Sequence, residues 1–181
     1  MKRYLLTTVL LCSQLLSATA SGNSVSAKAT ACVALLPAEA KAKLEAAYSG
    51  WNVLEHDQLY PHQHEIWGAR CPGVAVGQFR GTGEVGYAVV IVRQTKDIKQ
   101  AKLLLIEKQK TSYAIQLLRE QNEVPSYPVV HKEPPGVYRE FYDRESTTKV
   151  TNDVFVYEHL EATATLFYYK DGKYQELLIS D

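Results

Sequence analysis

Residues Gly77 to Val92, GQFRGTGEVGYAVVIV, decide the fold, because they join a glycine-punctuated loop directly to an apolar strand. The run from Tyr87 to Val92 is continuously apolar and rich in β-branched residues, which is typical of a central strand buried on both faces. Gly81 and Gly83 precede it, and glycine supplies the positive φ that a tight turn between two strands needs. This stretch therefore predicts a turn followed by a central strand.

Segments of β character flank this strand on both sides. Asp171-Gly172 lies between the runs TLFYY and YQELLI, which is typical of a two-residue type I′ hairpin. About eight short strands with brief connections predict a curled antiparallel meander sheet. The other predicted strands are Val74–Phe79, Leu103–Ile106, Ser112–Leu118, Val137–Tyr142, Val150–Tyr157 and Ala162–Tyr169.

One helix is expected before the strands. Pro37 suits the first turn of a helix, Glu39 complements its positive end, and Gly50 ends it. The following segment, EHDQLYPHQHE, is interpreted as a polar loop. The predicted fold class is therefore α+β, mainly antiparallel β, with one N-terminal amphipathic helix packed on the sheet. The apolar residues at helical spacing are Leu36, Ala40, Leu44, Ala47 and Tyr48.

The first twenty residues have the pattern of a secretory signal peptide. Lys2 and Arg3 are followed by an apolar run and by a small-residue end with an A-x-A site before Ser21. The run is shorter than the about 20 apolar residues of a membrane-spanning helix. We therefore expect a signal peptide at residues 1–20, a flexible leader at 21–35 and a single β-rich domain at 36–181. The mature chain would be periplasmic or extracellular, with no integral membrane segment.

Cleavage would remove Cys12 and leave Cys32 and Cys71. In an oxidising compartment, two remaining cysteines most simply form one disulfide. A reactive thiol pair would want close spacing such as C-x-x-C, which these positions lack. We therefore expect a structural bridge between Cys32 and Cys71.

The charge balance argues against nucleic acid and membrane partners. The chain carries 20 basic and 20 acidic side chains, and loss of Lys2 and Arg3 would leave 18 basic against 20 acidic. No basic surplus is available to neutralise phosphates, so nucleic acid is not expected as a partner. No long basic amphipathic stretch indicates a membrane surface either.

The glycine-bearing loop has the glycine spacing of a ligand-binding loop but lacks the groups that would bind a ligand. A calcium loop needs oxygen donors at alternate positions, but Gln78, Arg80, Thr82 and Gly86 occupy those positions, and Arg80 is a cation. A phosphate-binding loop leads into a helix N-terminus, whereas this loop leads into a strand. We therefore expect a backbone turn here, and no cofactor.

The stretch CPGVAVGQFRGTGEVGYAVVIV, which begins at Cys71, resembles a degenerate FG-GAP/VCBS-type loop with its following strand. Together with KEPPGVYREFY and the terminal YYKDGKYQELLISD, it is similar to a group of small exported bacterial proteins of uncharacterised function. The resemblance covers residues 71–181 and implies a secreted β-rich domain. It transfers no catalytic residue, because none is established in that group. Nor does it transfer a metal ligand, because the aspartates of FG-GAP loops are missing here.

The polar loop also holds a cluster of histidines. His62 and His64 have the i, i+2 spacing that places two imidazoles on one face of an extended segment, and His56 is near in sequence. Zinc and copper use such ligands, although the second half of a closed site is missing. A small envelope metal-binding protein or hydrolase using this region is therefore an alternative function. The hydrolase signatures G-x-S-x-G and H-E-x-x-H are absent from the sequence.

Tyrosine is crowded in the last third of the chain. The segment EPPG stiffens the approach to Tyr138, although it also suits a loop that enters an edge strand. Tyr168 and Tyr169 are adjacent, so they should face opposite sides of one strand. Exposed tyrosines recur at interfaces, which favours a non-catalytic binding module of the bacterial cell envelope with an envelope protein or a glycan as partner. The candidate interaction surface is Glu133, Pro134, Pro135, Tyr138, Tyr142, Tyr168 and Tyr169.

Overall fold

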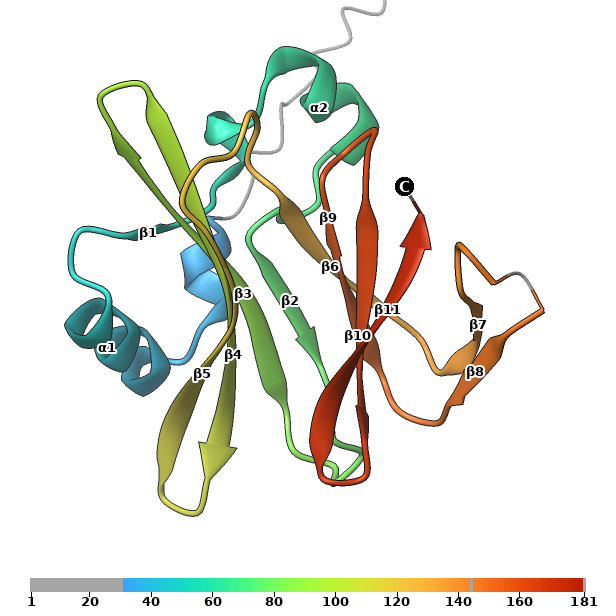
Figure 1. Cartoon of the computed structure of the whole chain (residues 1–181). Coiled ribbons are helices and arrows are strands. Elements are labelled where there is room, and N and C mark those ends of the chain that lie inside the picture. The colour runs from blue at the N-terminus through green and yellow to red at the C-terminus, as the bar shows by residue number, and fades with distance from the viewer. Residues whose placement is uncertain (1–30, 144, 181) are drawn as a thin grey trace, which may run out of the picture.

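The computed structural model describes residues 31–143 and 145–180, which form two antiparallel sheets packed face to face (Figure 1). The expected signal peptide and most of the expected leader lie outside the described residues. Sheet A has the order β1-β3-β4-β5, and β2 also pairs with β3. Its strands are β1 (Asn52–Val53), β2 (Val74–Gly77), β3 (Gly86–Thr95), β4 (Ile98–Gln109) and β5 (Ser112–Gln121).

Sheet B has the order β11-β10-β9-β6, and a separate two-stranded hairpin, β7–β8, packs against its outer face. A main-chain hydrogen bond from the Val130 N–H to the Pro72 carbonyl (2.8 Å) joins sheet B to the segment that enters β2. The two sheets therefore meet along a β2–β6 margin. The strands are β6 (Val129–Glu133), β7 (Gly136–Arg139), β8 (Thr147–Val150), β9 (Val154–Glu158), β10 (Ala164–Lys170) and β11 (Lys173–Ser180).

The helices lie in the N-terminal part of the described chain. They are the 3₁₀ helices η1 (Cys32–Leu35) and η2 (His56–Gln58) and the α-helices α1 (Ala38–Ala47) and α2 (Pro61–Trp67). Pro37 precedes α1 and Glu39 lies in its first turn, where a carboxylate is favourable. None of the helices in the described residues combines the length and the apolar character needed to cross a membrane.

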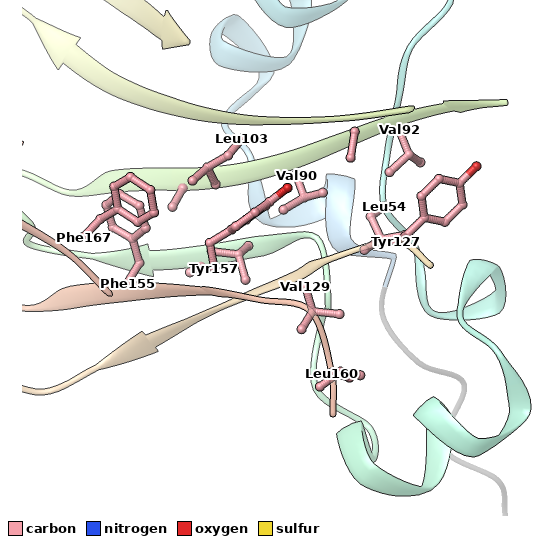
Figure 2. Close-up of a cluster of buried hydrophobic side chains, with 14 of the residues drawn as sticks. Leu54, Val90, Val92, Leu103, Tyr127, Val129, Phe155, Tyr157, Leu160 and Phe167 are labelled. Atoms are coloured by element: carbon pink, nitrogen blue, oxygen red, sulfur yellow. The ribbon is translucent and has the colours of Figure 1, made fainter. Parts of the chain in front are cut away.

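The main core fills the space between the two sheets (Figure 2). Val90 of β3 and Leu103 of β4 point from sheet A toward Phe155 and Tyr157 of β9. The rings of Phe155 and Phe167 stack with their centroids 5.2 Å apart. Burial of a side chain of this size contributes about 1.5–3 kcal/mol, so this cluster holds the sheets together.

A second core lies on the other face of sheet A, beneath α1 and η1. Ala40 and Leu44 of α1 pack with Ile91 of β3 and Leu104 of β4. Since Val90 belongs to the core between the sheets and Ile91 to this one, β3 is buried on both faces. The predicted central strand is therefore confirmed.

The mainly antiparallel β character is confirmed, but its arrangement differs from a single curled meander. The described residues form eleven strands in two sheets and a hairpin, not about eight strands in one sheet. The predicted strand Val150–Tyr157 is interrupted between β8 and β9, where the Asp153 carboxylate accepts the Gln78 N–H (2.9 Å). The spacing of apolar residues along the sequence identifies strands, but it does not identify which strands pair with each other.

Two elements lie in segments for which no regular structure was predicted. β6 carries His131, Lys132 and Glu133, whose polar character hides the strand. α2 overlaps the segment interpreted as a polar loop. Its residues show no apolar period that would indicate a helix, because only Gln63 and Trp67 are buried.

The two predicted turns are confirmed. Asp171 and Gly172 have φ values of +52° and +82° and connect the paired residues Lys170 and Lys173, as in a type I′ hairpin. Gly81 has a φ of +70° in the loop that joins the antiparallel strands β2 and β3. The glycine-bearing loop therefore turns the chain.

Candidate functional site

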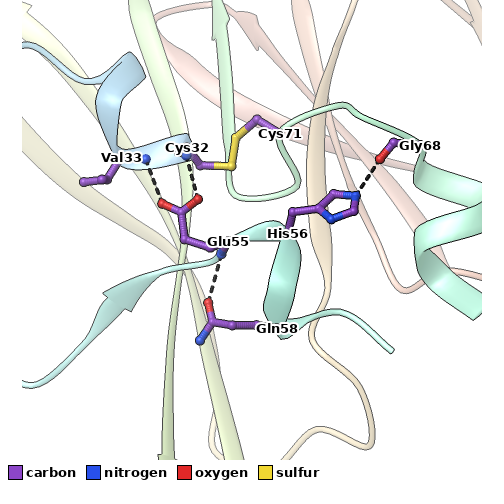
Figure 3. Close-up of a disulfide and its surroundings, with 7 residues drawn as sticks. All are labelled: Cys32, Val33, Glu55, His56, Gln58, Gly68 and Cys71. Atoms are coloured by element: carbon purple, nitrogen blue, oxygen red, sulfur yellow. Dashed lines mark hydrogen bonds between the residues drawn. A yellow bond between two sulfur atoms is a disulfide. The ribbon is translucent and has the colours of Figure 1, made fainter. Parts of the chain in front are cut away.

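A disulfide fixes the start of the described chain to the sandwich (Figure 3). Cys32 in η1 and Cys71 before β2 have Cα atoms 5.4 Å apart, so the expected bridge is confirmed. The Glu55 carboxylate accepts hydrogen bonds from the N–H groups of Cys32 (2.6 Å) and Val33 (3.0 Å). Gln58 Oε1 in turn accepts the Glu55 N–H (2.9 Å). Cys32 is 1% exposed, which suits a structural bridge.

The β7–β8 hairpin and its connection carry the two most exposed of the large apolar side chains in the described residues. Tyr142 is 72% exposed and Val137 is 65% exposed, whereas the others reach 47% at most. β7 alternates, with Val137 facing outward and Tyr138 half-buried against sheet B. The Tyr138 hydroxyl donates to the Pro134 carbonyl, which ties the EPPG segment to the hairpin.

Tyr168 and Tyr169 face opposite sides of β10, as predicted. Tyr168 packs in the same cluster as Tyr138, beneath the hairpin. Tyr169 instead contacts the Tyr174 ring at 5.2 Å, and the Arg80 guanidinium lies 5.1 Å from its centroid. The structure therefore places Tyr168 with the hairpin and Tyr169 away from it.

Polar side chains also connect the two sheets. Arg80 binds the Glu107 carboxylate through Nε (2.7 Å), and the Tyr174 hydroxyl donates to the same carboxylate (2.7 Å). Arg119 of β5 pairs with Glu176 of β11. No local pattern in the sequence predicts these pairs, because their members are far apart in the chain. Arg80, which is a cation in the glycine-bearing loop, thus has a structural partner.

The histidines of the notional metal site do not all converge. The rings of His56 and His64 are 4.3 Å apart, and their Nε2 atoms contact the carbonyl oxygens of Gly68 (2.6 Å) and Leu59 (3.0 Å). His62 lies elsewhere, 3.8 Å from Glu161. No group of three or more histidine, cysteine or acidic residues is arranged to hold a metal ion within residues 31–143 and 145–180.

Glu133, which precedes the EPPG prolines, lies beside a half-buried histidine. Its carboxylate is 3.3 Å from His131 Nε2, and Glu158 is 3.9 Å from Nδ1. Burial lowers the pKa of His131 below its ordinary value, despite these two carboxylates. His131 Nδ1 and Trp67 Nε1 are buried without a hydrogen-bond partner among the described residues. Glu133 is therefore part of a polar cluster at the base of the hairpin.

One surface feature was missed from the sequence. A groove of about 570 Å³ runs between α1 and the start of β5, lined by Lys43, Ala46 and Ala47 on one side and by residues 112–115 on the other. The sequence also contains a Ser-x-x-Lys pattern at Ser146 and Lys149, but Ser146 precedes β8, and residues three apart along extended chain point to opposite faces. Unlike this pattern, the groove brings residues from two separate elements together around a hollow.

By its fold, the described chain is a two-sheet antiparallel β sandwich with a helix over one face. Comparison with protein-family models, with curated proteins and with solved structures finds no match to this chain.

Proposed function

We propose that this chain is an exported, non-catalytic binding module of the bacterial cell envelope, which binds a protein partner through the β7–β8 hairpin. The observation that carries the proposal is the exposure of Val137 (65%) and Tyr142 (72%) on an outer layer of the fold. Exposed apolar side chains of this size cost free energy in water, and aromatic residues recur in interface cores. Export is the expectation from the N-terminal sequence.

The hairpin is held in place before any partner binds. Tyr138 packs on sheet B and its hydroxyl is bonded to Pro134, while the Phe141 N–H donates to the Leu178 carbonyl (2.9 Å) of the edge strand β11. Binding therefore orders few additional groups, which reduces its entropic cost. An aliphatic side chain beside the tyrosine favours a protein over a glycan, since glycans stack on flat rings.

The test compares two pairs of substitutions in a capture experiment from cell-envelope extract. Val137→Ser with Tyr142→Ser should abolish the capture of a specific partner, while the stability of the chain changes little. Ile66→Ser with Ile98→Ser, at side chains that are each 47% exposed elsewhere, is the matched control and should retain it. Equal capture by both variants, or a glycan as the captured species, would contradict the proposal.

A metal-binding or hydrolytic function remains the alternative, supported by the approach of His56 and His64. If it holds, purified protein incubated with Zn²⁺ or Cu²⁺ should retain one equivalent after desalting. His56→Ala should then remove the metal and His62→Ala should not, because His62 lies apart. Retention that is insensitive to His56 would exclude this pair as the ligands.

A further inference from the structure

Strand β5 is an outer strand of sheet A, and no strand of the described residues pairs with its free edge. The two-residue turn Lys110-Thr111 connects the paired residues Gln109 and Ser112. In such a hairpin the pair that flanks the turn is hydrogen bonded, and hydrogen-bonded and free pairs then alternate. The N–H and C=O groups of Tyr113 therefore point away from β4.

A side-chain contact supports this orientation. Lys43 Nζ of α1 donates to the Tyr113 carbonyl at 2.6 Å, which requires that carbonyl to face the edge. By alternation along the strand, the main-chain groups of Ile115 and Leu117 face the same way. Three residues thus present a row of donors and acceptors on the open side of the sheet.

The edge borders the groove between α1 and β5. Tyr113 and Ile115 pack partly against the core beneath α1, and Leu117 is 43% exposed. Ala46 and Ala47 form the opposite wall, and their short side chains leave the groove open. An extended segment lying along β5 would therefore hydrogen bond to the strand and place alternate side chains against α1.

The charges at one end of the groove specify the segment further. Lys43 lines the groove, and Lys108 is directly opposite Tyr113 in the register of β4 and β5. Residues directly opposite in a sheet share a face, so Lys108 lies on the α1 side. Neither lysine has an ion pair with another described residue, whereas Lys41 on the same helix pairs with Glu45.

We propose that β5 and the α1 groove form a second binding site, for an extended acidic segment of a protein partner that adds a strand to sheet A. The carboxylates of the segment pair with Lys43 and Lys108. Its main chain hydrogen bonds to Ile115, Leu117 and the Tyr113 N–H, since Lys43 already binds the Tyr113 carbonyl. This site is separate from the β7–β8 hairpin and does not depend on the function proposed for it.

The experiment is a selection of random eight-residue displayed peptides on the purified, oxidised protein. Enriched peptides should carry aspartate or glutamate and apolar residues at alternate positions. A synthetic copy of the most enriched peptide should protect the amides of Ile115 and Leu117 from hydrogen exchange. Lys43→Glu should weaken its affinity by about tenfold or more, because attraction becomes repulsion.

Lys41→Glu is the matched control, since it makes the same charge change on the same helix outside the groove. It should leave the affinity within about twofold of the unmodified protein. The proposal is overturned if no acidic peptide is enriched, or if Lys41→Glu weakens binding as much as Lys43→Glu. It is also overturned if the amides protected from hydrogen exchange lie outside β5. It is also overturned if sedimentation shows that a second copy of the chain occupies the edge.

Discussion

Tyr157 is buried and Tyr174 is half-buried, and the hydroxyl group of each forms a hydrogen bond between the two sheets. Tyr157 donates to Gln121 Oε1 (2.6 Å), and Tyr174 donates to Glu107 Oε1 (2.7 Å). Burial raises the pKa of both hydroxyl groups above the ordinary value of 10.0, and the Glu107 carboxylate raises that of Tyr174 further. Both groups therefore stay protonated in the folded chain at a pH at which they ionise in the unfolded chain.

The stability of the protein should consequently fall as the pH rises above about 10. The folded chain holds these two protons more tightly than the unfolded chain does. Their contribution to the free energy of unfolding is therefore complete below pH 10. Above pH 10 it falls by up to about 1.4 kcal/mol per pH unit for each tyrosine. Tyr157→Phe should make the decline shallower. Urea unfolding at a series of alkaline pH values measures both slopes, and identical slopes would contradict the assignment to Tyr157.

Single-residue features could be predicted from the sequence only where the signal is local. Alternation along a strand predicted that Tyr168 and Tyr169 face opposite sides. The role of Glu55 could not be predicted, because its carboxylate binds N–H groups 22 and 23 positions away. Those partners come together only when the disulfide and η1 are in place.

At the scale of elements, the glycine-bearing loop between β2 and β3 is constrained by its neighbours. Gly81 has a φ of +70°, and a Cβ built there would lie 2.2 Å from Asn152 Oδ1. Gly83 has a φ of +83°, and a Cβ there would meet no atom within 4 Å. An alanine at either position would therefore have the same backbone strain, but in different surroundings.

Gly81→Ala should lower the free energy of unfolding by about 2 kcal/mol or more, and Gly83→Ala by about 1 kcal/mol. The difference arises because only Gly81 must also displace the Asn152 side chain. Chemical denaturation of both variants measures it. In the background of Asn152→Ala, the two glycine substitutions should have similar effects, and a persistent difference would mean that Asn152 is not the cause.

At the scale of elements, apolar patterns located the strands better than their boundaries or partners. β3 was identified because its run is apolar on both faces, and the last hairpin because Asp171-Gly172 has a defined turn chemistry. β6 was missed because its polar residues face outward or toward the hairpin. The groove beside β5 was missed because it depends on how α1 crosses the sheet, which no local pattern contains. For the hairpin surface, the sequence pointed to Tyr142 but not to Val137, whose exposure depends on how the hairpin packs on sheet B.

At the scale of the molecule, the disulfide closes a loop that contains α1, β1, η2 and α2. Its cysteines are 39 positions apart. Closing a loop of this length lowers the conformational entropy of the unfolded chain, which raises the free energy of unfolding by about 4 kcal/mol. Reduction should lower the free energy of unfolding by about this amount, as measured by denaturation with and without reductant. Equal stability of the oxidised and reduced forms would contradict this view.

The two long margins of the sandwich are closed by different kinds of contact. On the β2–β6 side a main-chain hydrogen bond joins Val130 to Pro72, while on the far side the Arg119 and Glu176 side chains, 32% and 48% exposed, form an ion pair. Dissolved ions weaken exposed ion pairs and leave amide bonds nearly unaffected. A rise in ionic strength should therefore loosen the contact between β5 and β11 selectively and leave the β2–β6 contact nearly unchanged.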